Sequence, residues 1–123
     1  MILVDTSVWI DHLRSSESKL IELLQAGSVL IHSLVIGELA CGTMKARAQR
    51  LNDWKALPRI GELSHESVWS AIESRNLMGR GIGFIDAHLL CAVLGHNGTL
   101  LWTRDRSLKS LAQEFGVLFP ETV

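Results

Sequence analysis

Short apolar runs alternate with longer segments of helical periodicity along this chain. The apolar runs do not alternate with polar residues, which is typical of parallel strands buried on both faces. Buried strands are expected at residues 2–5, 29–31, 99–103 and 117–119, with a short extended piece at 60–63. Helices are expected at residues 6–13, 17–26, 33–41, 45–57, 64–77, 84–94 and 106–115. Strands separated by helices indicate an α/β fold, in which a parallel sheet has helices on both faces.

Capping residues and glycines set the expected helix boundaries. Ser33 and Ser64 are expected to be N-caps, and Gly27 is expected to end the helix before it. Residues 79–83 hold glycine at every second position and are expected to form a flexible loop. Because this loop follows a helix rather than a strand, it does not match a dinucleotide-binding phosphate loop.

Composition narrows the class of protein. The 123 residues are 47% hydrophobic, which favours one folded domain spanning residues 1–123. No apolar run approaches the ~18–20 residues of a membrane span, and the N-terminus lacks the basic stretch of a signal peptide. Cys41 and Cys91 fall in apolar helical segments and are expected to be core residues in a reducing compartment. We therefore expect a cytoplasmic protein with no membrane partner.

Four acidic residues lie where the surrounding sequence is apolar. Asp5 ends the first apolar run, and Asp105 follows the run at 100–103. Glu38 and Asp86 lie on the apolar stripes of their helices, which predicts that both side chains point toward the core. A buried carboxylate without a partner costs several kcal/mol, roughly, so the group of acids suggests one shared cation. Oxygen ligands select Mg²⁺ or Mn²⁺, and ligands of an open α/β sheet bind at the carboxyl ends of its strands.

Each acid taken singly also has a simpler explanation. Asp5 or Asp105 fits a helix cap. Asp86 fits a first-turn acid that the helix dipole favours, and Glu38 fits an exposed position on an amphipathic helix. The joint occurrence of all of them favours a shared metal site over separate explanations.

The hydroxyl and histidine side chains near these acids do not identify a particular kind of site. Ser7 and Thr103 lie near the strand ends and are expected to hold metal-bound water, although each also fits an ordinary turn or strand position. The five histidines show no zinc spacing with each other or with cysteine. His88 lies two residues from Asp86 and on another helix face, so we expect it to be structural.

The acids stand in motifs that resemble a known family. The motifs are VDTSVWID at 4–11, ELACG at 38–42, IGFIDA at 82–87 and LWTRD at 101–105. In this order and spacing they resemble the PIN-domain ribonucleases, specifically the VapC toxins of bacterial toxin–antitoxin modules. The resemblance covers nearly the whole chain. It implies a three-layer sandwich with a central parallel five-strand sheet.

The resemblance also implies an activity and partners. It implies a Mg²⁺- or Mn²⁺-dependent endoribonuclease toxin that hydrolyses RNA phosphodiester bonds and is inhibited by a small cognate antitoxin similar to VapB. The catalytic and metal-binding residues carried over are Asp5, Glu38, Asp86 and Asp105. A homodimer is expected as well, from the family and from the apolar residues of helix 17–26 and around Trp54.

Basic residues suggest where RNA binds. Arg80, Arg104 and Arg106 flank the expected site and are candidates for phosphate contacts, with a solvated surface as the alternative. The net charge of −1 gives no general nucleic-acid signature, but residues 45–59 are rich in lysine and arginine and could extend an RNA track. Many members of the family carry a further acid where this chain has Ser107, so we expect weaker binding of a second metal ion.

Two alternatives belong to other functional classes. A Mg²⁺-dependent phosphoacceptor signalling domain also has a doubly wound fold, but it requires adjacent N-terminal acids, and Asp5 has no acidic neighbour. A catalytically inactive module that binds nucleic acid or a partner would not need the complete acid set. RNA cleavage with and without metal distinguishes these alternatives.

Overall fold

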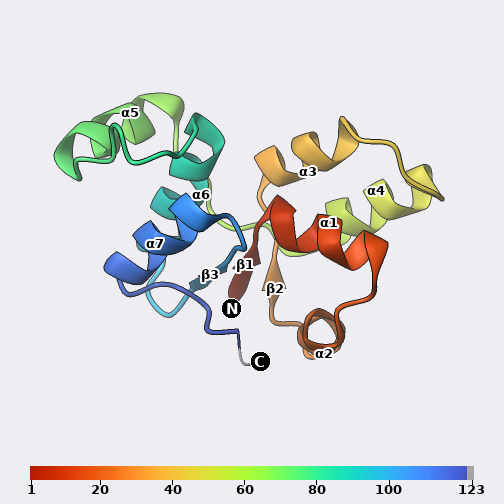
Figure 1. Cartoon of the computed structure of the whole chain (residues 1–123). Helices are drawn as coiled ribbons and strands as arrows, with labels where there is room; N and C mark the ends of the chain where they lie inside the picture. The colour runs from red at the N-terminus through yellow and green to blue at the C-terminus, as the bar shows by residue number, and fades with distance from the viewer. Residues whose placement is uncertain (122–123) are drawn as a thin grey trace.

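The computed structural model describes residues 1–121, and a small parallel sheet lies at its centre (Figure 1). The strands are β1 (Ile2–Val4), β2 (Val29–Leu30) and β3 (Leu100–Trp102). The order is β2-β1-β3, so the first strand of the chain is the middle strand and is buried throughout. Ile2 pairs in parallel register with Val29 on one side and with Leu100 on the other. This arrangement confirms the α/β class.

The expected five-strand sheet is wrong in the number of strands, since residues 1–121 form three. The extended piece at 60–63 and the segment at 117–119 are not strands. Instead, Arg59 and Leu118 each form a single parallel bridge to the sheet. Just before the first segment, Pro58 faces β2 and has no N–H to donate, so the ladder of hydrogen bonds cannot extend there.

The helices follow the apolar periodicity closely. They are α1 (Thr6–Arg14), α2 (Ser18–Gln25), α3 (Ser33–Ala40), α4 (Arg47–Ala56), α5 (His65–Ser74), α6 (Phe84–Leu94) and α7 (Arg106–Glu114). The bounds of α6 are those predicted, and Ser64 caps α5 by accepting from Ser67 N–H, as expected. Helix α4 begins later than predicted, because Ala46 has a left-handed backbone (φ 52°).

The N-cap of α3 differs from the prediction. Ser33 is the first residue of the helix, and the preceding His32 is its N-cap. The Nδ1 atom of His32 accepts a hydrogen bond from Leu34 N–H at 3.0 Å. Ser33 instead donates its backbone N–H and its hydroxyl to the carboxylate of Glu62. A histidine cap lies outside the usual preference for short polar side chains, so propensity alone does not predict it.

The helices lie in two groups beside the sheet. Figure 1 shows α1 to α4 on one side of the strands and α5 to α7 on the other, with α1 packed on α3 and α6 packed on both α5 and α7. Every residue from Ala87 to Val93 in α6 is buried, which explains its lack of a polar face. This central helix carries Asp86 to the carboxyl end of the sheet.

The structure also tests what the sequence predicts for the cysteines, for Trp54 and for membrane-spanning helices. Cys91 is buried as expected, but Cys41 is exposed because it lies at the C-cap of α3, where the helix has ended. Trp54, expected on an exposed apolar surface, is buried and packs edge-on against Trp9 at 5.9 Å between ring centroids. Within residues 1–121, no helix has the length and apolar character needed to cross a membrane.

Candidate active site

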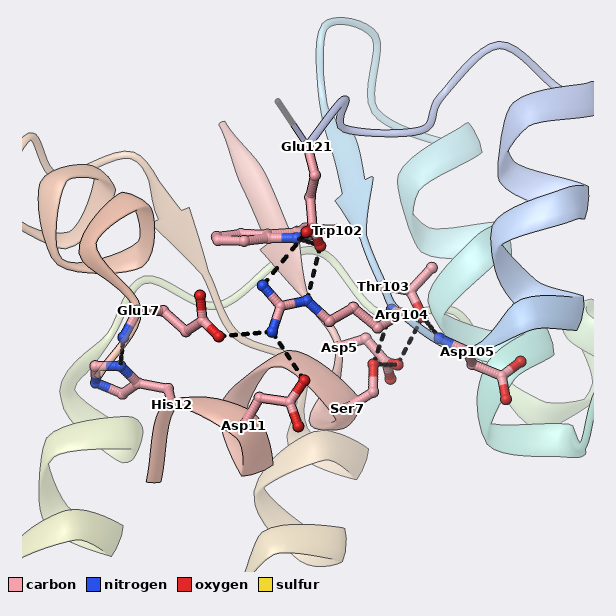
Figure 2. Close-up of polar contacts among 10 residues, drawn as sticks. All are labelled: Asp5, Ser7, Asp11, His12, Glu17, Trp102, Thr103, Arg104, Asp105 and Glu121. Carbon is pink, nitrogen blue, oxygen red and sulfur yellow. Dashed lines mark hydrogen bonds and ion pairs between the residues drawn. The ribbon is translucent and has the colours of Figure 1, made fainter. Parts of the chain in front are cut away.

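Asp5 is a buried carboxylate held by two hydroxyls at the end of β1. Its backbone N–H donates to the Trp102 carbonyl at 2.9 Å, which fixes it between β1 and β3. Its Oδ2 atom accepts from Ser7 Oγ at 2.7 Å and from Thr103 Oγ1 at 2.8 Å (Figure 2). Asp5 occupies the N-cap position of α1 but makes no capping bond with its side chain. The cap explanation therefore fails for this residue.

Glu38 is held by a different helix. Thr6, the buried first residue of α1, donates its hydroxyl to Glu38 Oε1 at 2.7 Å. Glu38 itself is exposed, so the prediction that it points into the core is wrong. The reason is that it lies near the C-terminal end of α3, where the helix leaves the core and only Leu39 beside it is buried. The Thr6 contact nevertheless turns its carboxylate toward the start of α1.

Asp86 and Asp105 stand at the N-terminal ends of α6 and α7. Asp86 Oδ2 accepts from Gly83 N–H at 3.3 Å, and Asp105 Oδ2 accepts from Leu108 N–H at 2.9 Å. The simpler explanations considered for these acids, a first-turn acid and a helix cap, therefore both hold. They do not compete with a metal site, because each capping bond uses only one carboxylate oxygen.

The electrostatics of Asp86 link the acids to one another. Burial is the largest cause that raises the pKa of Asp86, to about 6, and the negative charges of Asp5, Asp105 and Glu38 raise it further. The hydrogen bond from Gly83 acts in the opposite direction. The other three acids are therefore close enough to Asp86 for their negative charges to disfavour its ionisation.

The donor set fits a hard divalent cation. Within residues 1–121, each of these acids has one oxygen hydrogen-bonded to the protein and a second oxygen with no protein donor, and none pairs with a lysine or arginine. In the same part of the chain, no three histidine, cysteine or acidic side chains already stand in a metal-holding arrangement. The negative charges of the four carboxylates repel one another, which opposes a closer arrangement of these side chains. A cation bound among the carboxylates would offset that repulsion.

The PIN domain family matches residues 2–114, which is most of the chain. Ribonuclease VapC32 of Mycobacterium tuberculosis, found in two strains, is 45% identical over 123 residues, covering 100% of this chain and 99% of the relative. This chain is a PIN-domain protein of the VapC family.

A solved structure supports the same fold for this PIN domain. The crystal structure of PAE2754 from Pyrobaculum aerophilum aligns with a TM-score of 0.63 and 19% sequence identity. The alignment covers 89% of this chain and 82% of the other. At this identity the likeness concerns the fold alone.

Arg104 lies beside the acids of the PIN domain but turns its guanidinium away from them. Nη1 lies 2.8 Å from Asp11 Oδ2 and 2.7 Å from Glu17 Oε1, and Nε lies 2.8 Å from Glu121 Oε1 (Figure 2). The guanidinium also lies 5.7 Å from the ring centroid of Trp102. These contacts raise the pKa of Arg104, with the hydrogen bond to Glu17 the largest cause. In this arrangement the guanidinium is engaged with protein carboxylates and does not face a phosphate site.

The other two predicted RNA-binding arginines are more accessible. Arg80 is exposed and pairs with Glu114 at 3.1 Å. Arg106 is exposed at the start of α7, next to Asp105. Both remain candidates for contact with RNA.

Several contributing residues were not predicted. The sequence predicts Thr6 only as the start of a helix, and it assigns no role to Asp11. Adjacency to Asp5 in the first motif was the one available signal for Thr6. Nothing in the sequence indicates that Asp11, Glu17 and Glu121 share one arginine, because these residues lie far apart in the chain. Ser7 and Thr103 both donate to Asp5 itself, a contact that was not predicted for either residue.

Proposed function

We propose that this chain is the endoribonuclease toxin of a toxin–antitoxin module and that it hydrolyses RNA phosphodiester bonds with Mg²⁺ or Mn²⁺. Asp5, Glu38, Asp86 and Asp105 would hold the cation. The observation that carries the proposal is that each of these carboxylates is held through one oxygen, keeps the other without a protein donor and pairs with no basic side chain within residues 1–121. The full-length similarity to Ribonuclease VapC32 supports the activity.

The protein residues prepare the site in distinct ways. Ser7 and Thr103 fix the orientation of Asp5 by donating to one of its oxygens, and Thr6 does the same for Glu38. The backbone N–H groups at the ends of α6 and α7 hold the remaining two acids. A bound divalent cation would supply a Lewis acid that activates water and offsets charge on phosphate oxygens. No protein nucleophile is required.

A basic depression next to Glu38 supports an RNA substrate. This depression encloses about 470 Å³ and is lined in part by Glu38, Arg14, Lys45 and Arg50. Its basic side chains come from α1 and from the segment at and before the start of α4, which includes part of the region predicted as an RNA track. Phosphate contacts of this kind orient a nucleic acid without reading its sequence. We propose that RNA lies along this depression, with Arg106 binding phosphate on the other side of the acids.

The cognate antitoxin, a homodimer and a cytoplasmic location are further parts of the proposal. The antitoxin follows from membership of the VapC family. For the homodimer, the buried Trp54 no longer provides a surface, but exposed Trp69 and Met78 offer apolar area on and after α5. Sedimentation of the purified protein would test it, and a monomer at micromolar concentration would contradict it. A location in the cytoplasm agrees with an RNA substrate and remains a prediction.

The proposed activity is tested with purified protein and a mixture of cellular RNAs. We expect cleavage at defined positions with Mg²⁺ or Mn²⁺, loss of cleavage after chelation, and recovery when metal is returned. Sequencing of the new RNA ends identifies the sites. Coexpression with a cognate antitoxin similar to VapB should suppress cleavage. RNA binding without cleavage under all metal conditions would instead support the inactive binding module.

A further inference from the structure

Three histidines from three elements form a cluster at α6, where His88 lies two residues after Asp86. His32 precedes α3, His65 begins α5, and His88 lies within α6. His65 Nδ1 lies 2.8 Å from His88 Nε2, which is a hydrogen bond. His32 and His88 meet edge to face with ring centroids 5.9 Å apart. The cluster therefore runs from the exposed His65 to two rings inside the protein.

Two nitrogen atoms in this cluster have no hydrogen-bond partner within residues 1–121. They are His32 Nε2 and His88 Nδ1, on side chains that are 1% and 2% exposed. A buried polar atom left unpaired destabilises the fold, because it has lost its hydrogen bonds to water and gained none in return. Two such atoms on neighbouring rings therefore require an explanation.

The hydrogen-bond donors around the rings determine which nitrogen carries the proton. Leu34 N–H donates to His32 Nδ1, so a neutral His32 carries its proton on Nε2. His32 Nε2 is then a donor without an acceptor. If His88 donates from Nε2 to His65 Nδ1, its Nδ1 is an acceptor without a donor. The two unpaired atoms are complementary.

The charged residues near His32 and His88 leave both imidazole rings neutral. Burial is the largest cause that lowers the pKa of His32 and also that of His88. Glu62 opposes this for both, with Oε1 lying 3.9 Å from His32 Nδ1, but both its oxygens accept from Ser33. Arg59 favours the neutral form of His32.

We propose that the three histidines form one continuous chain of neutral imidazoles that positions α3 relative to α6. In this chain His32 Nε2–H donates toward His88 Nδ1, directly or through one water molecule, and His88 Nε2–H donates to His65. Phe84 covers the chain, with its ring centroid 4.7 Å from that of His88. This chain of imidazoles joins the N-cap of α3, the helix that carries Glu38, to α6, the helix that carries Asp86.

The chain of imidazoles would affect the site through α3 and α6, the two helices that it joins. Glu38 and Asp86 come from α3 and α6, and a rigid link between the two helices sets the separation of their carboxylates. His32, His65 and His88 are therefore positioning residues and not ligands of the cation. This effect on the metal rests on the proposed function, whereas the tautomers of the rings do not.

The tautomers are measured by two-bond ¹H–¹⁵N correlation NMR on the full chain without metal, at a pH where the rings are neutral. We expect both His32 and His88 in the Nε2–H form. His96, whose Nδ1 lies 2.7 Å from the Ala92 carbonyl oxygen and must donate to it, serves as the reference for the Nδ1–H form. A His88 ring in the Nδ1–H form would place two donors against each other and would overturn the chain, whatever the protein does to RNA.

The positioning role is measured by Mn²⁺ calorimetry on folded variants, without RNA. His88→Leu, which places an apolar side chain of similar size in the same buried position, should retain the fold yet bind Mn²⁺ roughly tenfold more weakly, because the link between α3 and α6 is lost. His88→Gln, which keeps a donor and an acceptor, should recover part of the affinity. Ser70→Ala on the exposed surface of α5 should match the wild type. Unchanged Mn²⁺ affinity in folded His88→Leu would overturn the positioning role, while loss of Mn²⁺ binding by the wild type would instead reject the proposed metal site.

Discussion

At the scale of single residues, Asp86 carries the largest electrostatic strain of the site. Its folded pKa of about 6 exceeds its ordinary value of 3.8. Between these two values the folded protein binds more protons than the unfolded chain, so the contribution of Asp86 to stability decreases as pH rises from about 4 to 6. Above pH 6 the full destabilisation remains unless a cation is bound.

Replacing Asp86 therefore tests this strain directly. Asp86→Asn should stabilise the metal-free protein at pH 7 by about 1–2 kcal/mol, because one pKa unit corresponds to about 1.4 kcal/mol and partial solvent exposure screens the effect. The gain should vanish at pH 4. Urea unfolding at the two pH values measures it. Equal stability of both proteins at pH 7 would mean that the acids do not repel one another in the fold.

Ser107 is the position where the family pattern loses an acid. Its Oγ atom faces Gly81, since a Cβ at Gly81 would lie 2.7 Å from it. Ser107→Asp adds negative charge near the mouth of the site and should tighten Mn²⁺ binding several-fold, roughly, by increasing attraction for a hard cation. Calorimetry measures the change, with Ser110→Asp, one turn further along α7, as the control. Equal effects of both substitutions would assign the change to general charge.

At the scale of secondary-structure elements, one hydrogen bond connects α1 to α3 at the site. Thr6→Val removes the hydroxyl that holds Glu38 while keeping the branched shape of the side chain. We expect the cleavage rate to fall roughly tenfold with little loss of stability, as is usual for residues that support metal ligands. Ser70→Ala, which removes a hydroxyl at an exposed position on α5, is the control. A wild-type rate in Thr6→Val would show that Glu38 does not need this support.

The elements were also the part of the fold that the sequence predicted best. Helix α6 was predicted to the residue, because its apolar run and flanking glycines agree. The outer segments were predicted as extended, but a single bridge and a ladder look alike in sequence when a proline adjoins the segment. The His32 cap was missed because histidine is a poor guide to caps and its bond to Leu34 N–H depends on the rotamer.

The site was predictable to the extent that motifs mark it. Each of the four acids interrupts an apolar pattern, and the negative charges of the other three help to raise the pKa of Asp86, while their shared role at a metal site stays a prediction. Their supporting contacts join residues up to 98 positions apart, as in the bond from Thr103 to Asp5, and periodicity carries no signal for such pairs. Arg104 was placed correctly beside the site, but the direction of its side chain depends on acids from three other segments.

At the scale of the whole molecule, Arg104 joins the two ends of the chain. Its partners come from α1, from the residue before α2 and from the C-terminal segment, while its backbone N–H donates to Ser7. Arg104→Gln should destabilise the protein by about 1–3 kcal/mol, because it leaves three carboxylates without their shared cation. Arg80→Gln, which loses one exposed pair, should change stability by less than about 0.5 kcal/mol.

Thermal unfolding at low and high salt separates these effects. The Arg104 variant should lose stability at both salt concentrations, since its network is partly buried and therefore weakly screened. If Arg104→Gln is as stable as Arg80→Gln, the network does not hold the ends of the chain together.

The central claim is that four carboxylates form one metal-dependent nuclease site. The most direct measurement is the RNA cleavage rate, with saturating Mn²⁺, of a folded variant carrying both Asp5→Asn and Asp86→Asn. Asp53→Asn, an exposed acid on α4, is the matched control. We expect the double variant to lose cleavage by at least about a thousandfold while the control keeps the wild-type rate. Wild-type cleavage by the folded double variant would contradict the account.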